Sequence, residues 1–580
     1  MLTSTLPVPP TTRRAAFRPW LPLALCLLLA AALRLRLHLV GDFLLVGSDG
    51  PYYPLQVRAI LEHGRLAFPD MPLLFGAEAL LARLLQLLTA APPDQCVVRA
   101  IQLVDVLVPP LAGVPVLRLA RLLRPAGPVR GLPLLVAAYA VLNLTTIVSF
   151  GTGLHKNAVG LVGVFWFVYL LTKWLLHRRH ADAAWTALAL GLCALTHFGS
   201  FALLLPWLAL LGLVAGLSRQ VLSGGRLAAG AALAAGLLAA VAGADPQRLT
   251  RLVQLPGKLF AAPVLLFVWE GHPLPLWPPL LLSTLVANGL VLLGLALLLR
   301  RWHSTPPVLR QLGVSLGLWG LLLASPLLGL EWASRLYMMS FVPVVGLYLV
   351  LASCYPLPRL RGPLALVFAG LTGGAVLFGL FLPPSVSISP AAYQELRQLP
   401  RYLPLRPTDV LTGRQDLRLL VSWLHRPASA ADYALTPADT ARYRAVYVLR
   451  QLRGSNLPPA RFREPAVPPH AVRAYRGPGF EVYRLTARSW PAWRRGRPLR
   501  RVRGQLARVD GAALLLRPET GRPLAVRVLR TAEQQFRSAK PGWRPGMWVE
   551  AWGDSRPFSL GLDARAIHEV APPEAQHGRE

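Results

Sequence analysis

Long apolar segments recur along the first 384 residues and give way to a polar, Arg-rich and Pro-rich sequence after Pro384. A helix needs about 17 to 25 mainly apolar residues to cross the hydrocarbon core of a bilayer. Segments of about this kind lie at 19–39, 97–117, 131–149, 158–176, 183–198, 200–217, 227–243, 279–299, 312–329, 335–353 and 364–383. The pattern predicts a polytopic α-helical membrane domain over residues 1–384, with about eleven spans.

Basic residues alternate between the connecting segments and predict the orientation of the spans. They gather before the first span (Arg13, Arg14, Arg18) and in every second connection after it. Because loops rich in Lys and Arg stay in the cytoplasm, an odd number of spans places the C-terminal part outside. The first apolar run has no convincing cleavage site, so we expect an uncleaved span. The expected location is the bacterial inner (cytoplasmic) membrane, with an extracytoplasmic C-terminal domain.

The polar remainder divides into two small domains. After a linker at 385–407, residues 408–490 combine a helix at 416–425 with strand-like runs at 444–449 and 480–485, as in a small α/β domain. Residues 498–571 contain five short strand-like runs separated by turns, at 501–509, 512–517, 524–529, 547–552 and 564–570. This spacing predicts a small β-barrel of the oligonucleotide/oligosaccharide-binding type.

Charge and missing motifs narrow the possible functions. The chain carries a formal net charge of +34, so its basic C-terminal part could rest against anionic headgroups or acidic glycans. The sequence contains no Walker loop, no GxGxxG after a strand, no HExxH and no CxxC. A nucleotide-driven pump or a soluble nucleotide-sugar enzyme therefore has no support. We expect no cofactor and no metal site, although a divalent ion is an open alternative.

Acidic residues are scarce in the membrane domain, and several fall in short loops on the predicted outer face. The first and longest of these loops, 41–96, contains Asp49 in the segment Gly-Ser-Asp-Gly-Pro-Tyr-Tyr, residues 47–53. Gly50 and Pro51 form a turn that would expose the Asp49 carboxylate, and a carboxylate at that place can act as a general base. The alternative is an ordinary Asp that caps a turn at the end of a span.

Further along this loop the sequence predicts two helices. Residues 54–63 have the apolar spacing of an interfacial helix, and 73–88 form an amphipathic candidate with Glu78, Arg83 and Gln86 on its polar face. Asp105, inside the second span, needs a partner or water because an unpaired charge is costly there.

The first span, the segment 47–53, the helix ending at Glu62-His63-Gly64 and the segment Asp70–Leu74 together resemble the first periplasmic loop of the GT-C glycosyltransferase superfamily. That superfamily includes protein O-mannosyltransferases, lipid A aminoarabinose transferases and oligosaccharyltransferase catalytic subunits. The resemblance covers residues 15–385 by topology and about 30 residues by motif. It implies that Asp49 is the catalytic or acceptor-binding carboxylate and that the donor is a polyprenyl-phosphate-linked sugar.

Two cations are candidates for binding the donor phosphate. Arg335 opens the tenth predicted span, and a guanidinium suits bidentate phosphate binding; it could instead pair with Glu331 on the same helix face. Lys156 lies in a short outer loop, where it could stabilise a phosphate leaving group or merely snorkel towards water. Further candidates for substrate binding are Tyr52, Tyr53, Asp70, His155, Glu270, His272 and Glu331.

The sequence therefore predicts an inverting cell-envelope glycosyltransferase. It would move a hexosyl or pentosyl group from a lipid-phosphate donor to a glycan, lipid or protein acceptor on the extracytoplasmic side. One alternative is a transporter or flippase of lipid-linked oligosaccharides, which would place polar groups at the bilayer midplane. Another is a non-catalytic scaffold whose basic C-terminal barrel binds a glycan or, if it were cytoplasmic, nucleic acid. For an extracytoplasmic domain we expect no nucleic-acid partner.

Overall fold

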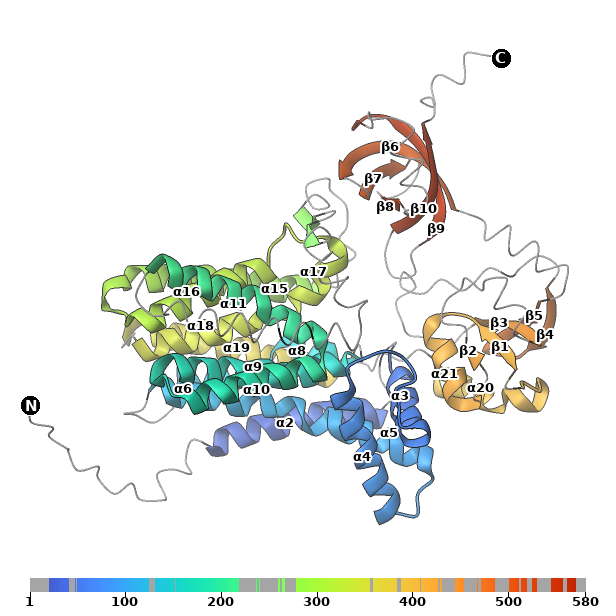
Figure 1. The fold of residues 1–580 in the computed structure, drawn as a ribbon, viewed down its shortest axis with the longest axis horizontal. Coiled ribbons are helices and arrows are strands. Elements are labelled where there is room, and N and C mark those ends of the chain that lie inside the picture. Colours follow the sequence, from blue (N-terminus) through green and yellow to red (C-terminus); the bar gives the residue numbers. More distant parts are fainter. Residues whose placement is uncertain are drawn as a thin grey trace, which may run out of the picture.

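The computed structural model describes residues 20–40, 47, 49–124, 131–151, 153–218, 236, 239, 259–260, 263–265, 278–354, 358–382, 388–406, 408–425, 428–429, 444–452, 467, 471–485, 500–510, 513–518, 524–528, 544–555 and 561–569. Figure 1 shows a helical bundle, a group of shorter helices at one end of it, a small α/β unit and a β-barrel.

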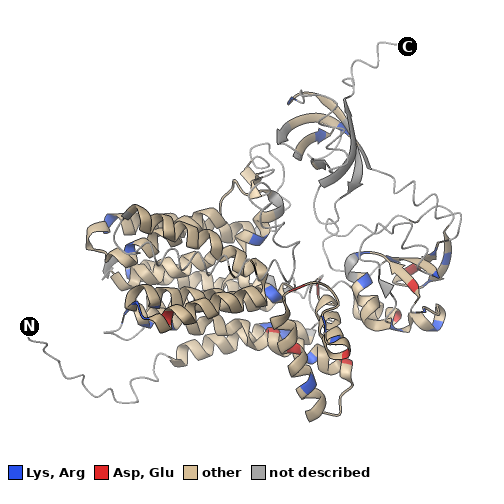
Figure 2. Cartoon of the chain, in the orientation of Figure 1, with Lys and Arg blue, Asp and Glu red and all other residues tan. Residues whose placement is uncertain are grey.

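Most helices of the bundle run side by side around one apolar core, as expected for a membrane domain (Figure 1). Within the described residues, seven helical segments are long and apolar enough to cross a membrane, and two shorter apolar ones accompany them. The bundle helices are α2 (Trp20–Val40), α5 (Pro93–Leu107), η1 (Pro109–Ala112), α6 (Gly113–Leu123), α7 (Leu132–Val141), α8 (Leu144–Gly151), α9 (His155–His177), α10 (His180–Thr196), α11 (Phe198–Ser218), α15 (Pro278–Arg300), α16 (Pro307–Leu323), α18 (Phe341–Cys354) and α19 (Pro358–Phe381). Figure 2 shows that the long faces of the bundle carry few charged residues.

The structure supports a multi-pass membrane protein, while the number of eleven spans stays a prediction. The span expected at 227–243 lies outside the described residues, apart from Gly236 and Ala239. The span expected at 131–149 is interrupted: the Asn143 side chain accepts the Thr146 N–H at 2.9 Å and caps the start of α8. The break therefore has a local cause, because the cap satisfies backbone donors that the interruption exposes.

The helices expected in the first loop are α3 (Tyr52–His63) and α4 (Pro72–Leu88), which pack on each other and on α5. They lie at one end of the bundle (Figure 1), which we call the first-loop end. One prediction about α4 was wrong. Glu78 does not lie on an exposed polar face; its side chain is completely buried, whereas Leu80, Leu84 and Leu87 are exposed. The apolar surface of α4 is wide enough that the sequence left its inward face ambiguous.

The α/β unit contains α20 (Pro390–Tyr402), α21 (Gln415–His425) and a five-stranded sheet in the order β2-β1-β3-β5-β4. Its strands are β1 (Asp409–Thr412), β2 (Ala428–Ser429), β3 (Ala445–Gln451), β4 (Val472–Arg476) and β5 (Phe480–Arg484). The segment 385–407 was expected to be a linker, but it contains α20, whose Leu396 and Leu399 are buried in this unit. Its apolar positions recur at helical spacing, and burying them stabilises the helix.

The α/β unit also packs against the first-loop helices. Buried residues of α3, α4 and α5 share one apolar cluster with residues of α20, α21, β1, β3 and β5. From α3, the buried Arg58 donates hydrogen bonds to the carbonyls of Ser422 at 2.9 Å and Trp423 at 2.8 Å, and its guanidinium lies 4.6 Å from the Trp423 ring centroid. A cation at the C-terminal turn of a helix is favoured electrostatically, so Arg58 stabilises the packing of α21 on α3.

The last five described strands form a closed barrel in the order β10-β8-β7-β6-β9. They are β6 (Arg500–Asp510), β7 (Ala513–Pro518), β8 (Leu524–Val528), β9 (Trp548–Ser555) and β10 (Gly561–Glu569). β8 and β10 pair in parallel and the other neighbours are antiparallel. All five strands therefore lie where turn spacing predicted them, within a few residues.

Acid should weaken the α/β unit through Asp409. Its buried carboxylate accepts two hydrogen bonds from Arg444, at 3.0 and 2.9 Å, and the Arg406 N–H at 2.9 Å. Burial alone would raise the pKa of Asp409, but these donors lower it below its ordinary value. The contribution of Asp409 to the stability of the α/β unit is therefore fully present above the pKa of this carboxyl in the unfolded chain, about 3.9. It is lost as the pH falls through the lower pKa of the folded state. Hydrogen exchange of β1 and β3 in the full chain, corrected for intrinsic rates, should show protection falling below pH 4, and less steeply in Asp409→Asn. Equal pH dependence in both proteins would contradict this.

Candidate functional site

Asp49 is exposed in the turn that immediately precedes α3. The turn is held by main-chain bonds: the Tyr52 N–H donates to the Asp49 carbonyl at 2.9 Å, and the Gly50 N–H donates to the Gly47 carbonyl at 3.2 Å. Gly47 has a φ of 87°, which favours glycine at that position. The backbone thus presents the Asp49 side chain at the first-loop end, as the sequence predicted for this turn.

Asp70 and Lys156 meet beside this turn, although they are far apart in the sequence. The Lys156 ammonium lies 2.5 Å from the Asp70 carboxylate, and the Tyr52 hydroxyl donates to the same oxygen at 2.5 Å. Lys156 Nζ also lies 4.9 Å from the Tyr52 ring centroid. Gln56 donates to the Tyr52 hydroxyl at 2.7 Å and thereby orients it. Three predicted site residues therefore form one contact group, and they come from α3, the segment before α4, and α9.

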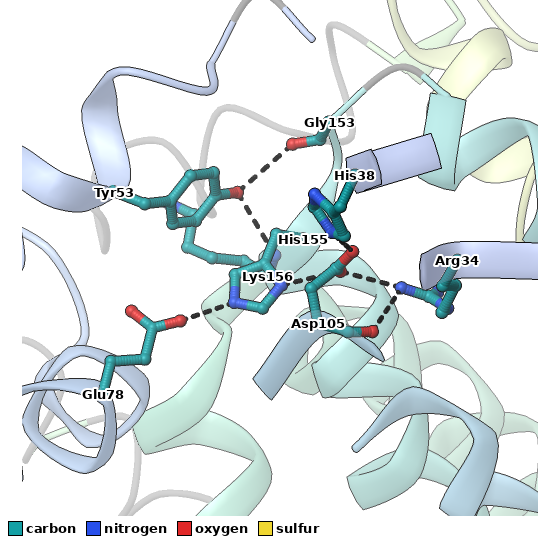
Figure 3. A network of polar contacts seen from close by, with 8 residues as sticks. All are labelled: Arg34, His38, Tyr53, Glu78, Asp105, Gly153, His155 and Lys156. Atoms are coloured by element: carbon teal, nitrogen blue, oxygen red, sulfur yellow. Dashed lines mark hydrogen bonds and ion pairs between the residues drawn. The ribbon is translucent and has the colours of Figure 1, made fainter. Parts of the chain in front are cut away.

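Tyr53 connects the Asp49 turn to the start of α9. Its hydroxyl accepts the Lys156 N–H at 3.2 Å and lies 3.5 Å from the Gly153 carbonyl (Figure 3). Burial raises the pKa of the Tyr53 phenol well above its ordinary range, and the nearby charge of Asp49 raises it further. Tyr53 is thus a neutral hydrogen-bonding group near Asp49, suited to holding the α8–α9 connection in place.

A second polar group lies behind this one, centred on His155 and Asp105. His155 Nδ1 lies 2.8 Å from Asp105 and its Nε2 lies 2.5 Å from Glu78 (Figure 3). Asp105 also accepts Arg34 at 2.8 Å and lies 2.9 Å from His38 Nε2. Burial raises the pKa of Glu78 above its ordinary value, and His155 opposes that shift. The partner that Asp105 required is therefore a set of three side chains from α2 and α9.

Sequence reasoning missed Arg34, His38 and Glu78. A signal was present for the first two, because they are four residues apart inside an otherwise apolar span and so share one helix face. Charged and titratable residues inside a span usually face a partner within the bundle. Glu78 had no such signal, because its apolar neighbours surround it on all sides of α4.

The remaining candidates lie elsewhere or outside the described residues. Arg335 is exposed on α17 (Leu330–Tyr337), which lies at the first-loop end of the bundle, and its guanidinium lies 5.7 Å from the Trp332 ring centroid. The side chain of Glu331 is not among those described, so its expected pairing with Arg335 stays a prediction. Glu270 and His272 lie outside the described residues.

The expectation that the site holds no metal stays a prediction. Among the residues that the structure describes, no group of three or more His, Cys, Asp or Glu is arranged to hold an ion. Asp70 already binds an ammonium and a phenol. A divalent ion there would have to displace the Lys156 charge, which disfavours the site electrostatically.

Comparison with known proteins identifies the fold. No protein-family model matches the sequence. No curated protein matches it either. Among solved structures, the chain is similar to the archaeal oligosaccharyltransferase AglB from Archaeoglobus fulgidus, solved in complex with an inhibitory peptide and a dolichol-phosphate. The TM-score is 0.51 at 12% sequence identity, over 75% of this chain and 70% of that chain. The chain therefore has a fold similar to that of this membrane oligosaccharyltransferase, which agrees with the fold that the first-loop resemblance implied.

Proposed function

We propose that the protein is an integral membrane glycosyltransferase that moves a sugar from a polyprenyl-phosphate-linked donor to an acceptor on the extracytoplasmic side. The observation that carries this proposal is the site at the first-loop end. An exposed carboxylate, Asp49, lies next to a group that contains a cation, Lys156, and two phenols, within a GT-C fold. A base and a phosphate-binding cation close together are the two elements that transfer from a phosphate leaving group needs.

The proposed reaction is a single displacement at the anomeric carbon. The acceptor hydroxyl gives its proton to the Asp49 carboxylate while its oxygen forms a bond to the anomeric carbon. The bond from that carbon to the phosphate oxygen breaks, and its electron pair leaves with the polyprenyl phosphate. Because the nucleophile attacks opposite the leaving group, the anomeric configuration inverts. Lys156 would offset the charge that develops on the departing phosphate.

A lipid phosphate is the donor class that the neighbouring cations favour. Lys156 is partly exposed in spite of its bond to Asp70, with 23% of its side chain accessible. Arg335 is exposed at the same end of the bundle and offers a planar fork of donors for phosphate oxygens. The similar archaeal enzyme was solved with a dolichol-phosphate, a lipid phosphate of the proposed class.

The packing of the α/β unit supports an extracytoplasmic location for this unit. The α/β unit shares an apolar cluster with the first-loop helices, and Arg58 binds two of its carbonyls. This unit must therefore lie on the same side of the membrane as the 41–96 loop. The positive-inside pattern places that loop outside the cytoplasm.

Transfer in vesicles tests the proposed function directly. Purified protein would be reconstituted and supplied with a panel of radiolabelled polyprenyl-phosphate sugars and a membrane extract as the acceptor source. We expect label to move from the lipid to an acceptor for at least one donor, with inversion of the anomeric centre. Protein-free vesicles are the control. Facilitated movement of the intact lipid donor across the bilayer without transfer would instead identify a flippase.

Loss of either cation should weaken donor binding. We expect Lys156→Ala to raise the Kd for undecaprenyl phosphate about tenfold or more, and Arg335→Ala to raise it to a similar extent, because a charge-assisted bond is worth about 1.5 to 3 kcal/mol. Titration of tryptophan fluorescence in detergent would measure this. Arg83→Ala is the matched control, since Arg83 is an exposed cation of the same loop whose side chain bonds Gln86. An unchanged Kd in Lys156→Ala would contradict the phosphate assignment.

A further inference from the structure

His155 has an acidic partner at each ring nitrogen, and all three side chains are buried. Nδ1 lies 2.8 Å from Asp105 on α5 and Nε2 lies 2.5 Å from Glu78 on α4, so the imidazole joins two helices to the start of α9. Hydrogen bonds at both ring nitrogens restrict rotation and displacement of the imidazole. The contacts fix the position of the first residue of α9 relative to the membrane bundle and to the first loop.

The two contacts set the proton count of this group. Each requires one proton between a ring nitrogen and a carboxylate oxygen, so His155, Glu78 and Asp105 together hold two protons and a net charge of −1. The buried guanidinium of Arg34, 2.8 Å from Asp105, offsets that charge. The group is therefore electrically balanced, which lets charged side chains persist in the interior.

We call the contacts of His155 with Glu78 and Asp105 the His155 clamp. His155 directly precedes Lys156 in the sequence. The Lys156 main-chain N–H is held on its other side by the Tyr53 hydroxyl at 3.2 Å, and its ammonium is held by Asp70 at 2.5 Å. Gly153, with a φ of 76°, closes the turn that leads into α9. The orientation of the Lys156 side chain therefore depends on a backbone anchored through His155.

We propose that His155 is a positioning residue: clamped between Glu78 and Asp105, it orients Lys156 for the phosphate group of the lipid donor. This inference rests on the proposed function, because it assumes that Lys156 binds that phosphate. Glu78 and Asp105 act through His155, so none of the three needs to contact the substrate. The clamp places the cation in advance, which lowers the entropic cost of binding.

Two substitutions at Glu78 test the clamp with matched charge. Glu78→Gln and Glu78→Leu both remove the carboxylate charge, but only the glutamine can donate to Nε2 of a neutral imidazole that keeps its Nδ1–H bond to Asp105. We expect the Kd for undecaprenyl phosphate to stay within about twofold of wild type in Glu78→Gln and to rise about tenfold in Glu78→Leu, because a displaced binding group loses much of its contribution. Equal Kd values in the two variants would overturn the proposal.

Repeating Glu78→Leu in the Lys156→Ala background separates the loss of Lys156 positioning from general damage to the fold. If His155 acts through Lys156, adding Glu78→Leu to Lys156→Ala should cause no further rise in Kd. Effects of the two substitutions on Kd that multiply independently would overturn the proposal.

The double variant Glu78→Leu/His155→Leu removes one positive and one negative group together, and its Kd should be raised as much as in Glu78→Leu or more. If this double variant binds like wild type while Lys156→Ala is impaired, the clamp fails and the proposed function stands. If Lys156→Ala itself binds normally, the phosphate assignment fails and the clamp proposal fails with it.

Discussion

Replacing Asp49 by asparagine is expected to lower the rate of sugar transfer by about 10² to 10⁴, the usual contribution of a general base. The amide is close to the carboxylate in size, so the turn held by the Asp49 carbonyl and Gly47 should keep its conformation. What is lost is the ability to accept the acceptor's proton. Initial rates with the labelled donor that wild-type protein uses would measure the effect, with the Kd for undecaprenyl phosphate determined in parallel.

Glu62→Gln is the matched control for this prediction. Glu62 lies at the other end of α3 and is partly exposed, with 33% of its side chain accessible. Its replacement should leave the transfer rate within about twofold, because it removes an equal charge from the same loop at a position away from the Asp49 turn. Transfer in Asp49→Asn at the wild-type rate would rule out the proposed base and leave the similarity of the fold to the oligosaccharyltransferase untouched.

Replacing Asp105 by alanine is expected to destabilise the folded protein by about 3 to 5 kcal/mol. Asp105 accepts the Arg34 guanidinium, which is completely buried, and contacts both His38 and His155. Without it, the buried Arg34 cation loses this carboxylate, and the two imidazoles lose a shared acceptor. The cost is large because one substitution removes a buried carboxylate from three partners at once.

SDS titration of the purified protein, followed by loss of helical circular dichroism, would measure this change. Asp94→Ala is the control on the same helix, since Asp94 is exposed in the first turn of α5. It should cost no more than about 1 kcal/mol, the range of an exposed charge near a helix N-terminus. A loss smaller than about 1 kcal/mol in Asp105→Ala would show that water or a rearranged side chain replaces the carboxylate.

Local patterns in the sequence predicted most of the described bundle helices and all five barrel strands, but only part of the α/β unit. Runs of apolar residues located the bundle helices, and turn spacing located the five barrel strands, because both signals depend on neighbouring residues. They failed at segment 385–407, where prolines indicated a linker but Leu396 and Leu399 are buried in a helix. They also placed Glu78 on the exposed face of α4, although its side chain is buried, because leucines lie on most sides of that helix.

In the candidate site, too, local patterns predicted some features and could not predict others. The turn at Asp49 was readable because Gly50 and Pro51 follow it directly, and Asp105 was recognisable as a charge in need of a partner. The contact between Asp70 and Lys156 joins residues 86 positions apart, and no local pattern reports such a distance. Asp70 and Lys156 were each singled out for their own chemistry, and not because the sequence predicted that they meet.

Composition and periodicity thus established a membrane bundle, two C-terminal domains and an exposed acid after the first span. Tertiary packing established that Arg34, Glu78, Asp105 and His155 meet, each from a different helix. The physical reason is that such a meeting depends on how each helix is rotated and crossed against its neighbours. That geometry is a property of the whole packed core and not of any one segment.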